Sequence, residues 1–282
     1  MRKLRNLFMM SALAVACIWG SKYNVSAKTK AVNPLKVNKT YQYNLDQKGA
    51  KEKVKVMETE KGDDQTFMTL YINDKAVVSD VKYGAAFVMD TNTKDKQMEI
   101  IVTKYFNDDY WADDMSSAVY YRYTGGKLKK VQTLGSVAKK KYKNLAFMHY
   151  ADKKAVFRVD SKGNLTYKVC LGLANALDYV HFSDTMQLKN GKFVNSTKKS
   201  FSLKDEEVSY RSKGTNKVYK SPGSSKVAFK LKNKAAFYKT GVYMKNSSTC
   251  YIKIKAKKTK KTGYIKNKSF KAYMDGTMHI GF

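Results

Sequence analysis

Apolar and polar residues alternate along much of the chain, which is the pattern of strands with one buried face. Five stretches show it most clearly: KVKVMET at 53–59, MEIIVTKYF at 98–106, AVYYRYT at 118–124, AVFRVD at 155–160 and CYIKIKA at 250–256. Turn signals rich in Gly and Asn separate such stretches, among them TGGK from Thr124 and DSKGN from Asp160. The pattern predicts an all-β fold. The one stretch expected to form a short helix is LGLANALDY at 171–179.

The first residues have the order of a secretory signal peptide. Arg2, Lys3 and Arg5 precede an apolar stretch at 7–20, and a polar stretch follows that ends in small residues at Ala27. We expect cleavage after Ala27, so residues 1–27 are a signal peptide and the mature chain is secreted. The apolar stretch is shorter than the roughly 20 residues that a membrane-spanning helix needs, and no other apolar run suggests a span. The alternative is a lipoprotein signal with Cys17 as the lipidated residue.

The chain is strongly basic, with 55 Lys and Arg against 23 Asp and Glu and a net charge of +32. After position 27 the only arginines are Arg122, Arg158 and Arg211, so lysine provides nearly all of this charge. The electrostatic field of so many positive charges attracts polyanions. The lysine ammonium acts as a point charge, whereas the arginine guanidinium makes two parallel hydrogen bonds to one group. The composition favours diffuse attraction to an anionic polymer over specific nucleic-acid recognition. A solvated, merely solubilising surface would have the same composition.

Two segments resemble each other at a spacing of 46 residues: NLDQKGAKEKVKV from Asn44 and DTNTKDKQMEIIV from Asp90. Each places Asn or Asp at alternate positions before a turn, an acidic residue and an apolar strand. They resemble propeller-blade repeats of the FG-GAP or VCBS type, with an eroded third copy through FRVDSKGNLTYKV. The resemblance covers 41–203 and implies a partial propeller-like or β-meander domain over 28–210.

Loops of these repeats often hold calcium, but the fifth loop position is a lysine in both copies, Lys48 and Lys94. An ammonium group repels the ion. The acids, Asp46 with Glu52 and Asp90 with Glu99, are therefore expected at turns and strand starts. We expect no metal and no other cofactor.

The C-terminal segments VYKSPGSSKVAFKLKNKAAFYKTG from Val218 and CYIKIKAKKTKKTGYIKNKSF from Cys250 resemble bacterial Src-homology-3-like (SH3b) modules of wall-associated proteins. Tyr251 and Tyr264 stand where that family often has tryptophan, and KTGYI at 261–265 carries its closing motif. The resemblance implies a small barrel over 211–282, and members of the family bind peptidoglycan or peptides. A polar stretch at 203–217 places the domain boundary near residue 210.

No catalytic motif is found, so we expect a protein that is not an enzyme. The chain has no G-x-S-x-G, P-loop or H-E-x-x-H motif, and His149, His181 and His279 lack a second ligand at metal-binding spacing. A cysteine nucleophile would need a histidine beside Cys170 or Cys250, and nothing around Cys170 resembles a peptidase. A disulfide between these two cysteines is an open alternative.

Two groups of residues are candidates for ligand binding. The first is the loop KYFNDDYWADDM, in which Tyr110 and Trp111 lie among four acids: Asp108, Asp109, Asp113 and Asp114. The second is a predicted hairpin turn with four lysines between two tyrosines: Lys257, Lys258, Lys260 and Lys261, with Tyr251 and Tyr264. Aromatic rings beside lysines would bind an anionic polymer with stacking support. Either group is equally explained as a solvated loop.

These observations predict a secreted, non-catalytic binding protein of a Gram-positive cell envelope, associated with the cell wall. The expected partner is an anionic cell-wall polymer or peptidoglycan. Two alternatives stay open: a carbohydrate-active hydrolase that uses the acids of the loop at 108–114, and a nonspecific extracellular polyanion binder for nucleic acid or heparin.

Overall fold

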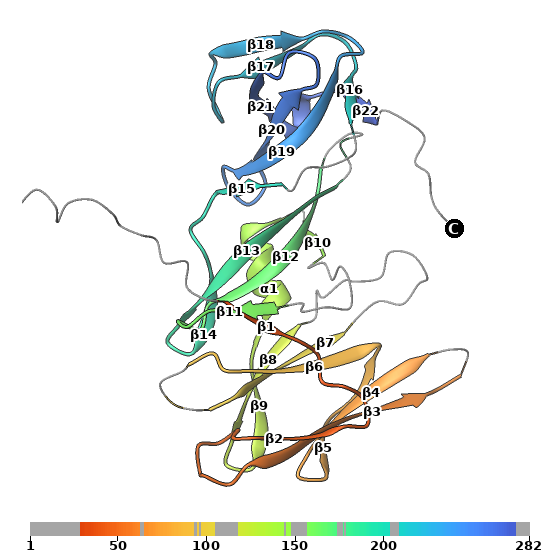
Figure 1. Cartoon of the computed structure of the whole chain (residues 1–282), viewed down its shortest axis with the longest axis vertical. Helices are drawn as coiled ribbons and strands as arrows, with labels where there is room; N and C mark the ends of the chain where they lie inside the picture. Colours follow the sequence, from red (N-terminus) through yellow and green to blue (C-terminus); the bar gives the residue numbers. More distant parts are fainter. Residues whose placement is uncertain are drawn as a thin grey trace, which may run out of the picture.

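The computed structural model describes residues 29–62, 65–92, 95, 97–104, 118–143, 145–147, 157–173, 177, 179–203 and 209–274. These residues form mostly antiparallel strands, which confirms the predicted all-β class (Figure 1). The predicted signal peptide and the acidic loop with Tyr110 and Trp111 lie outside the described residues.

The five stretches with the clearest alternation all contain strands: β3 (Glu52–Glu60), β7 (Glu99–Lys104), β8 (Val119–Thr124), β11 (Phe157–Val159) and β20 (Cys250–Ala256). In β3, Val54 and Val56 are buried, while Lys53 is exposed and Lys55 is half-buried, as a period of two requires. In β7, by contrast, every residue from Glu99 to Thr103 is buried. That strand is therefore covered on both faces.

Three sheets contain meanders, in which strands that follow each other in the sequence pair with each other. The first is β2 (Thr40–Tyr43), β3, β4 (Thr66–Ile72) and β5 (Lys75–Lys82). The second is β6 (Gly84–Met89), β7, β8 and β9 (Lys127–Thr133). The third is β11, β12 (Leu165–Gly172), β13 (Tyr179–Lys189) and β14 (Lys192–Asn195), with β1 (Lys30–Val32) beside β11 and β10 (Leu145–Phe147) beside β12.

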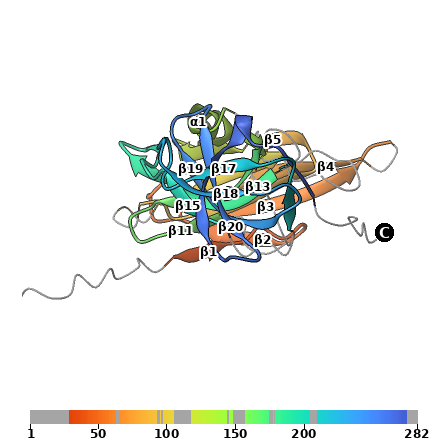
Figure 2. The ribbon, with the colours of Figure 1, turned by 90° about the horizontal axis from the view of Figure 1, so that it is seen from above.

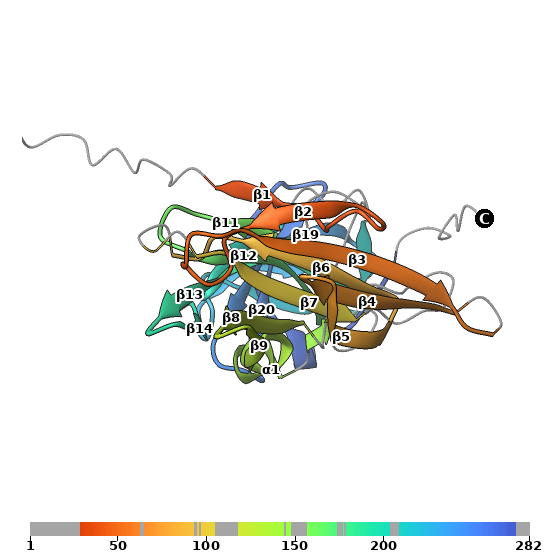
Figure 3. The same ribbon diagram turned by 90° about the horizontal axis from the view of Figure 1, so that it is seen from below.

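The second meander lies between two hydrophobic cores. Ile100 and Val102 point into a core shared with the first meander, whereas Ile101 points into a core shared with the third sheet. This alternation explains why the three consecutive residues Ile100, Ile101 and Val102 are all apolar. Figure 3 shows the first meander lying across β6 and β7.

The segment at 30–38 joins all three meanders. Lys30 pairs with Val159 of β11, the Leu35 N–H donates to the Ala86 carbonyl at 2.8 Å, and the Asn38 N–H donates to the Val56 carbonyl at 2.8 Å. One extended segment thus hydrogen-bonds to the third, second and first meanders in turn.

A fourth sheet lies at the other end of the molecule from the first meander (Figure 1). Its strands are β15 (Ser200–Ser202), β16 (Tyr210–Ser212), β17 (Asn216–Tyr219), β18 (Val227–Leu231), β19 (Ala236–Met244), β20, β21 (Thr262–Lys266) and β22 (Ala272–Met274). β19, β20 and β21 form consecutive hairpins, and β16 pairs with both β19 and β22. A short 3-10 helix, Asn267–Ser269, separates β21 from β22. Figure 2 looks down onto this sheet along the long axis.

The helix predicted at 171–179 does not span that stretch, of which residues 174–176 and 178 lie outside the described residues and Leu177 has a 3-10 conformation. Of the stretch at 171–179, Leu171 and Gly172 belong to β12 and Tyr179 begins β13. The α-helix among the described residues is α1 (Leu134–Lys141), which buries Leu134, Val137 and Ala138. No helix of the described residues is long and apolar enough to cross a membrane.

The core of the third sheet continues into the C-terminal sheet. Phe182 of β13 stacks on Phe201 of β15 with ring centroids 4.5 Å apart, and both belong to the same core as Phe237 of β19. β15 itself pairs with β19. The two parts of the molecule are therefore joined by packed apolar side chains.

A buried carboxylate lies beside this joint. Asp184 of β13 accepts hydrogen bonds from the Lys141 ammonium at 2.7 Å, the Tyr142 hydroxyl at 2.6 Å and the Ser196 hydroxyl at 2.8 Å. Burial and the Asp184 charge raise the pKa of Tyr142, which keeps its hydroxyl protonated as a donor. The network fixes the end of α1 to β13 and the residue after β14.

Candidate functional site

The positive charge of the chain is concentrated in its C-terminal part. Between Ser209 and Met274 the sequence has 18 lysines and one arginine but no aspartate or glutamate. Of the 23 acidic residues in the chain, only Asp275 follows Glu207. No acidic side chain within this segment offsets its field, so the C-terminal sheet is the part of the described structure best suited to an anionic ligand.

Tyrosine and lysine side chains share one face of the C-terminal sheet. Ile252, Ile254 and Ile265 point into the core, so the residues that alternate with them lie on the opposite face. We call this surface the Tyr–Lys face; it comprises Tyr219, Tyr243, Tyr251, Tyr264, Lys253 and Lys266.

Cross-strand pairing places these residues in two rows. One row runs Gly241, Lys253, Tyr264, Tyr219, and the other runs Tyr243, Tyr251, Lys266. Neighbouring strands are about 4.8 Å apart, so each aromatic ring lies within reach of an ammonium group in its row or the next. The face therefore offers both stacking surface and positive charge.

The two tyrosines singled out in the sequence are not equivalent. Tyr251 is only 9% exposed, its ring lies 6.4 Å from that of Tyr243, and a Cβ atom at Gly223 would lie 3.7 Å from its hydroxyl oxygen. Tyr264 is half-buried and lines a small hollow of about 140 Å³ with Tyr243, Lys253 and Gly241. Tyr264 thus retains contact surface for a ligand, whereas most of Tyr251 is packed within the protein.

The four lysines of the predicted turn are in a hairpin turn and are exposed, as expected. Lys257, Lys258, Lys260 and Lys261 lie between β20 and β21. The Ala256 N–H donates to the Lys261 carbonyl, and the Lys260 N–H donates to the Ala256 carbonyl, both at 2.9 Å.

Tyr251 lies at the far end of this hairpin, where it pairs with Lys266, so it does not flank the turn in space. The aromatic neighbour of the turn is Tyr238, whose ring centroid lies 5.9 Å from the Lys257 ammonium. Tyr238 pairs with Lys255, a relation that depends on β19–β20 register and was not apparent from sequence spacing.

The repeat loops use their acids for structure. Glu52 and Glu99 each begin a strand. The Glu52 carboxylate accepts the backbone N–H of Leu45 at 2.7 Å, and the Glu99 carboxylate accepts the backbone N–H of Thr91 at 2.9 Å. The acids of the turns do the same: Asp46 accepts from the Lys48 N–H at 2.9 Å, and Asp90 accepts from the Asn92 N–H at 3.0 Å. These are the turn and strand-start roles predicted from the sequence.

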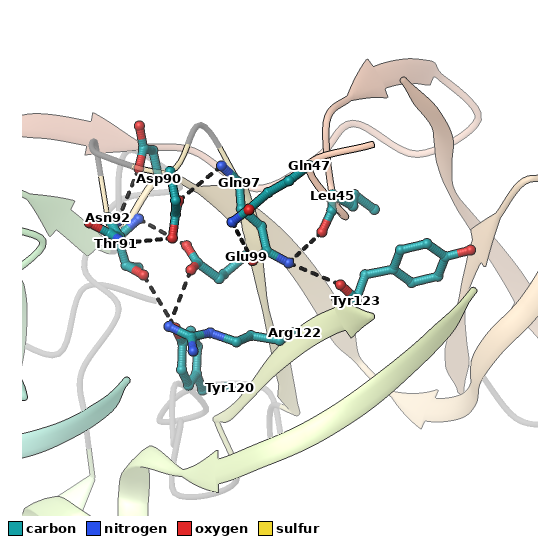
Figure 4. Close-up of polar contacts among 11 residues, drawn as sticks. Leu45, Gln47, Asp90, Thr91, Asn92, Gln97, Glu99, Tyr120, Arg122 and Tyr123 are labelled. Atoms are coloured by element: carbon teal, nitrogen blue, oxygen red, sulfur yellow. Dashed lines mark hydrogen bonds and ion pairs between the residues drawn. The ribbon is translucent and has the colours of Figure 1, made fainter. Parts of the chain in front are cut away.

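Glu99 is completely buried, with Arg122 3.6 Å from its carboxylate (Figure 4). Burial raises the pKa of Glu99, and the hydrogen bonds from Thr91 and the Arg122 charge oppose the shift.

The repeat loops also contact one another. The Gln97 side-chain amide donates to the Leu45 carbonyl at 2.6 Å, and a Cβ atom at Gly163 would lie 1.7 Å from the Thr91 carbonyl oxygen. Gly163, with φ +75°, is therefore required for the third loop to approach the second. Within the described ranges, no group of three or more His, Cys, Asp or Glu residues is placed to hold a metal ion.

The structure places a histidine beside Cys170: His181, which stands 11 residues after it in the sequence. Cys170 of β12 and His181 of β13 are directly paired, and the His181 Nε2 atom lies 3.1 Å from the Cys170 sulfur. The Cys170 side chain is fully buried. Cys170 and Cys250 do not form the disulfide that the sequence left open, and burial raises the pKa of Cys250 to about 11.

The other candidates fall outside the described residues. These are Asp108, Asp109, Tyr110, Trp111, Asp113, Asp114, Lys94, His149 and His279.

No family model matches the sequence, and no curated protein or solved structure matches the chain. Function is therefore inferred from the chemistry of its own residues.

Proposed function

We propose that the chain is a secreted, non-catalytic binding protein of the bacterial cell envelope that attaches to an anionic wall polymer through its C-terminal part. The observation that carries this proposal is the Tyr–Lys face, within a segment that has 19 basic residues and no acidic ones. Lysines supply attraction to a repeating anionic chain, and tyrosine rings supply contact surface for its sugar or polyol units.

The strand connections support assigning 211–282 to an SH3-like module. The first strand, β16, pairs with the last, β22. Five strands lie between them in sequence, in the hairpins β17–β18 and β19–β20–β21, and a 3-10 helix precedes β22. The resemblance to wall-associated modules adds peptidoglycan as a possible ligand of the same surface.

For the part before residue 210, the three consecutive meanders support an interpretation as propeller-like repeats. In two of them the same kind of loop connects the first strand to the second, with a strand-starting glutamate that accepts a backbone N–H seven or eight residues earlier. We assign this part a structural role, or the role of holding the C-terminal part in position, because its carboxylates accept hydrogen bonds from its own backbone.

The test is sedimentation of the purified protein with Gram-positive cell walls, with and without teichoic acid, across a salt series. We expect binding that requires the polymer and persists in part at high salt. Lys253→Gln/Lys266→Gln should weaken binding about tenfold, because both lysines lie on the Tyr–Lys face.

The matched control is Lys139→Gln/Lys140→Gln, which removes the same charge from exposed positions at the end of α1, outside that face. If both variants lose wall binding equally and salt abolishes the binding, the interaction is only diffuse electrostatic attraction, which any polyanion would show. Absence of binding to either wall preparation would overturn the proposal.

A further inference from the structure

An apolar hollow of about 550 Å³ lies beside the lysine turn, between the β18–β19 connection and the β20–β21 turn. Its floor consists of Phe229, Leu231, Ala235, Ala236 and Ala256. Its rim carries five lysines: Lys230, Lys232, Lys257, Lys258 and Lys261.

The hollow is formed by backbone contacts and small side chains. The Lys257 N–H donates to the Ala236 carbonyl at 2.9 Å, which holds the β20–β21 turn against the start of β19. The Ala235 N–H donates to the Lys232 carbonyl at 3.1 Å, which closes the connection on the other side. Three alanines on the floor leave the space that larger side chains would fill, so the hollow exists without a ligand.

The rim concentrates charge of one sign. All five rim lysines are exposed, and the segment from Ser209 to Met274 contains no acidic side chain to neutralise them. Their mutual repulsion is relieved by an anionic group, while the floor favours an apolar one. A ligand that satisfies both has an alkyl part and a negative charge a few atoms apart.

We propose that this hollow binds an anionic amphiphile, with its alkyl chain on the alanine floor and its phosphate among the rim lysines. A peptide in the same place would set its N–H and C=O groups against apolar side chains, which is unfavourable. Inorganic phosphate would leave the floor uncovered, and a neutral amphiphile would leave the lysines without a counter-charge.

This site differs from the Tyr–Lys face in its residues and its ligand. Both rely on the positive field of the same segment, but the variants below leave Lys253, Lys266 and Tyr264 unchanged. The experiments can therefore reject the proposed amphiphile site without rejecting polymer attachment, and the reverse.

The first experiment is isothermal titration calorimetry with decyl phosphate below its micelle concentration. We expect one site per chain and affinity at least tenfold higher than for inorganic phosphate or for decyl maltoside. Equal affinity for decyl maltoside would reduce the site to an apolar patch, and equal affinity for inorganic phosphate would reduce it to an anion site. Either outcome overturns the proposal, as does tighter binding of an acidic, leucine-containing peptide.

Variants then locate the site. Lys257→Gln/Lys258→Gln/Lys261→Gln should weaken decyl phosphate binding at least tenfold. Lys127→Gln/Lys139→Gln/Lys140→Gln, with the same change in net charge at exposed positions in β9 and α1, away from the hollow, should change it less than threefold. Ala235→Phe should abolish decyl phosphate binding, because the phenyl ring would fill the space above the floor of the hollow. If the Ala235→Phe protein does not fold, the lysine variants alone test the proposal. Equal effects of the two triple variants would overturn the proposal.

Discussion

The Lys239 ammonium lies 2.8 Å from the backbone carbonyl oxygen of Tyr179, although the two residues belong to different sheets. Lys239 is only 1% exposed, it also donates to the Leu177 carbonyl at 2.9 Å, and its ammonium lies 4.4 Å from the centre of the Tyr210 ring. A lysine on the core side of β19 thus binds the backbone at the start of β13. The C-terminal sheet and the third sheet share polar as well as apolar contacts.

Lys239→Met is expected to lower the free energy of unfolding by about 2 to 4 kcal/mol. The substitution retains most of the volume but leaves the buried Leu177 carbonyl and the partly buried Tyr179 carbonyl without this donor, at roughly 1–3 kcal/mol for a buried group and less for the other. Chemical denaturation followed by circular dichroism measures the change. Lys255→Met is the control, because Lys255 is an exposed lysine on the adjacent strand and its loss should change stability by less than about 0.5 kcal/mol. A Lys239→Met protein as stable as the original would contradict the structural role of this contact.

Asp184→Asn is expected to destabilise the protein by about 3 to 5 kcal/mol, the range for a buried ion pair that loses one partner. The Asp184 side chain is fully buried, and the substitution leaves the Lys141 ammonium, whose side chain is 12% exposed, without a counter-charge. Asp80→Asn breaks the pair with Lys61, in which both side chains are more than half exposed. That control should cost less than about 1 kcal/mol. If the two variants lost a similar free energy of unfolding, burial of the Asp184 network would make no additional contribution to stability.

Glu99 should make stability depend on pH in the direction opposite to an ordinary salt bridge. Its pKa in the folded state is above its ordinary value of 4.5, because burial disfavours the charged form. Between these two values the folded protein keeps a proton that the unfolded chain has released, so the contribution of Glu99 to stability decreases as pH rises. Its unfavourable effect is complete above the folded-state pKa and absent well below pH 4.5.

Glu99→Gln removes this titration while retaining an oxygen for the Thr91 N–H. We expect the original protein to gain stability relative to Glu99→Gln as the pH falls from 7 to 4, measured by urea denaturation at each pH. A difference that is constant over this range, or that changes in the other direction, would show that Arg122 and Thr91 outweigh burial.

Much of the fold was predictable because strands with one buried face have a simple period. The prediction of β3 and β20 needed only the alternation of Val54, Val56, Ile252 and Ile254 with lysines. The repeat of 46 residues likewise marked loops that use Glu52 and Glu99 in the same way.

What the sequence did not predict depends on tertiary contacts. Helix α1 reads LGSVAKKK, a stretch with little helix signal, and it is stabilised by burial of Leu134, Val137 and Ala138. Pairing of Cys170 with His181 and of Tyr238 with Lys255 depends on strand register, which local composition does not define. Composition does not distinguish Lys239 from the exposed lysines; its position two residues after the buried Phe237 places it on the core side of β19.

The segment at 30–38 has a consequence for the order in which this chain is able to fold. Lys30 finds its partner only at Val159, about 130 residues later, whereas the pairs within each meander are local. A chain that emerges with its N-terminus first must therefore keep β1 unpaired until β11 has appeared, and the edge of β11 stays open for the same time. The first strand of the sequence is thus among the last contacts to close, and the rate of folding is set by a loop that spans more than half of the described N-terminal part.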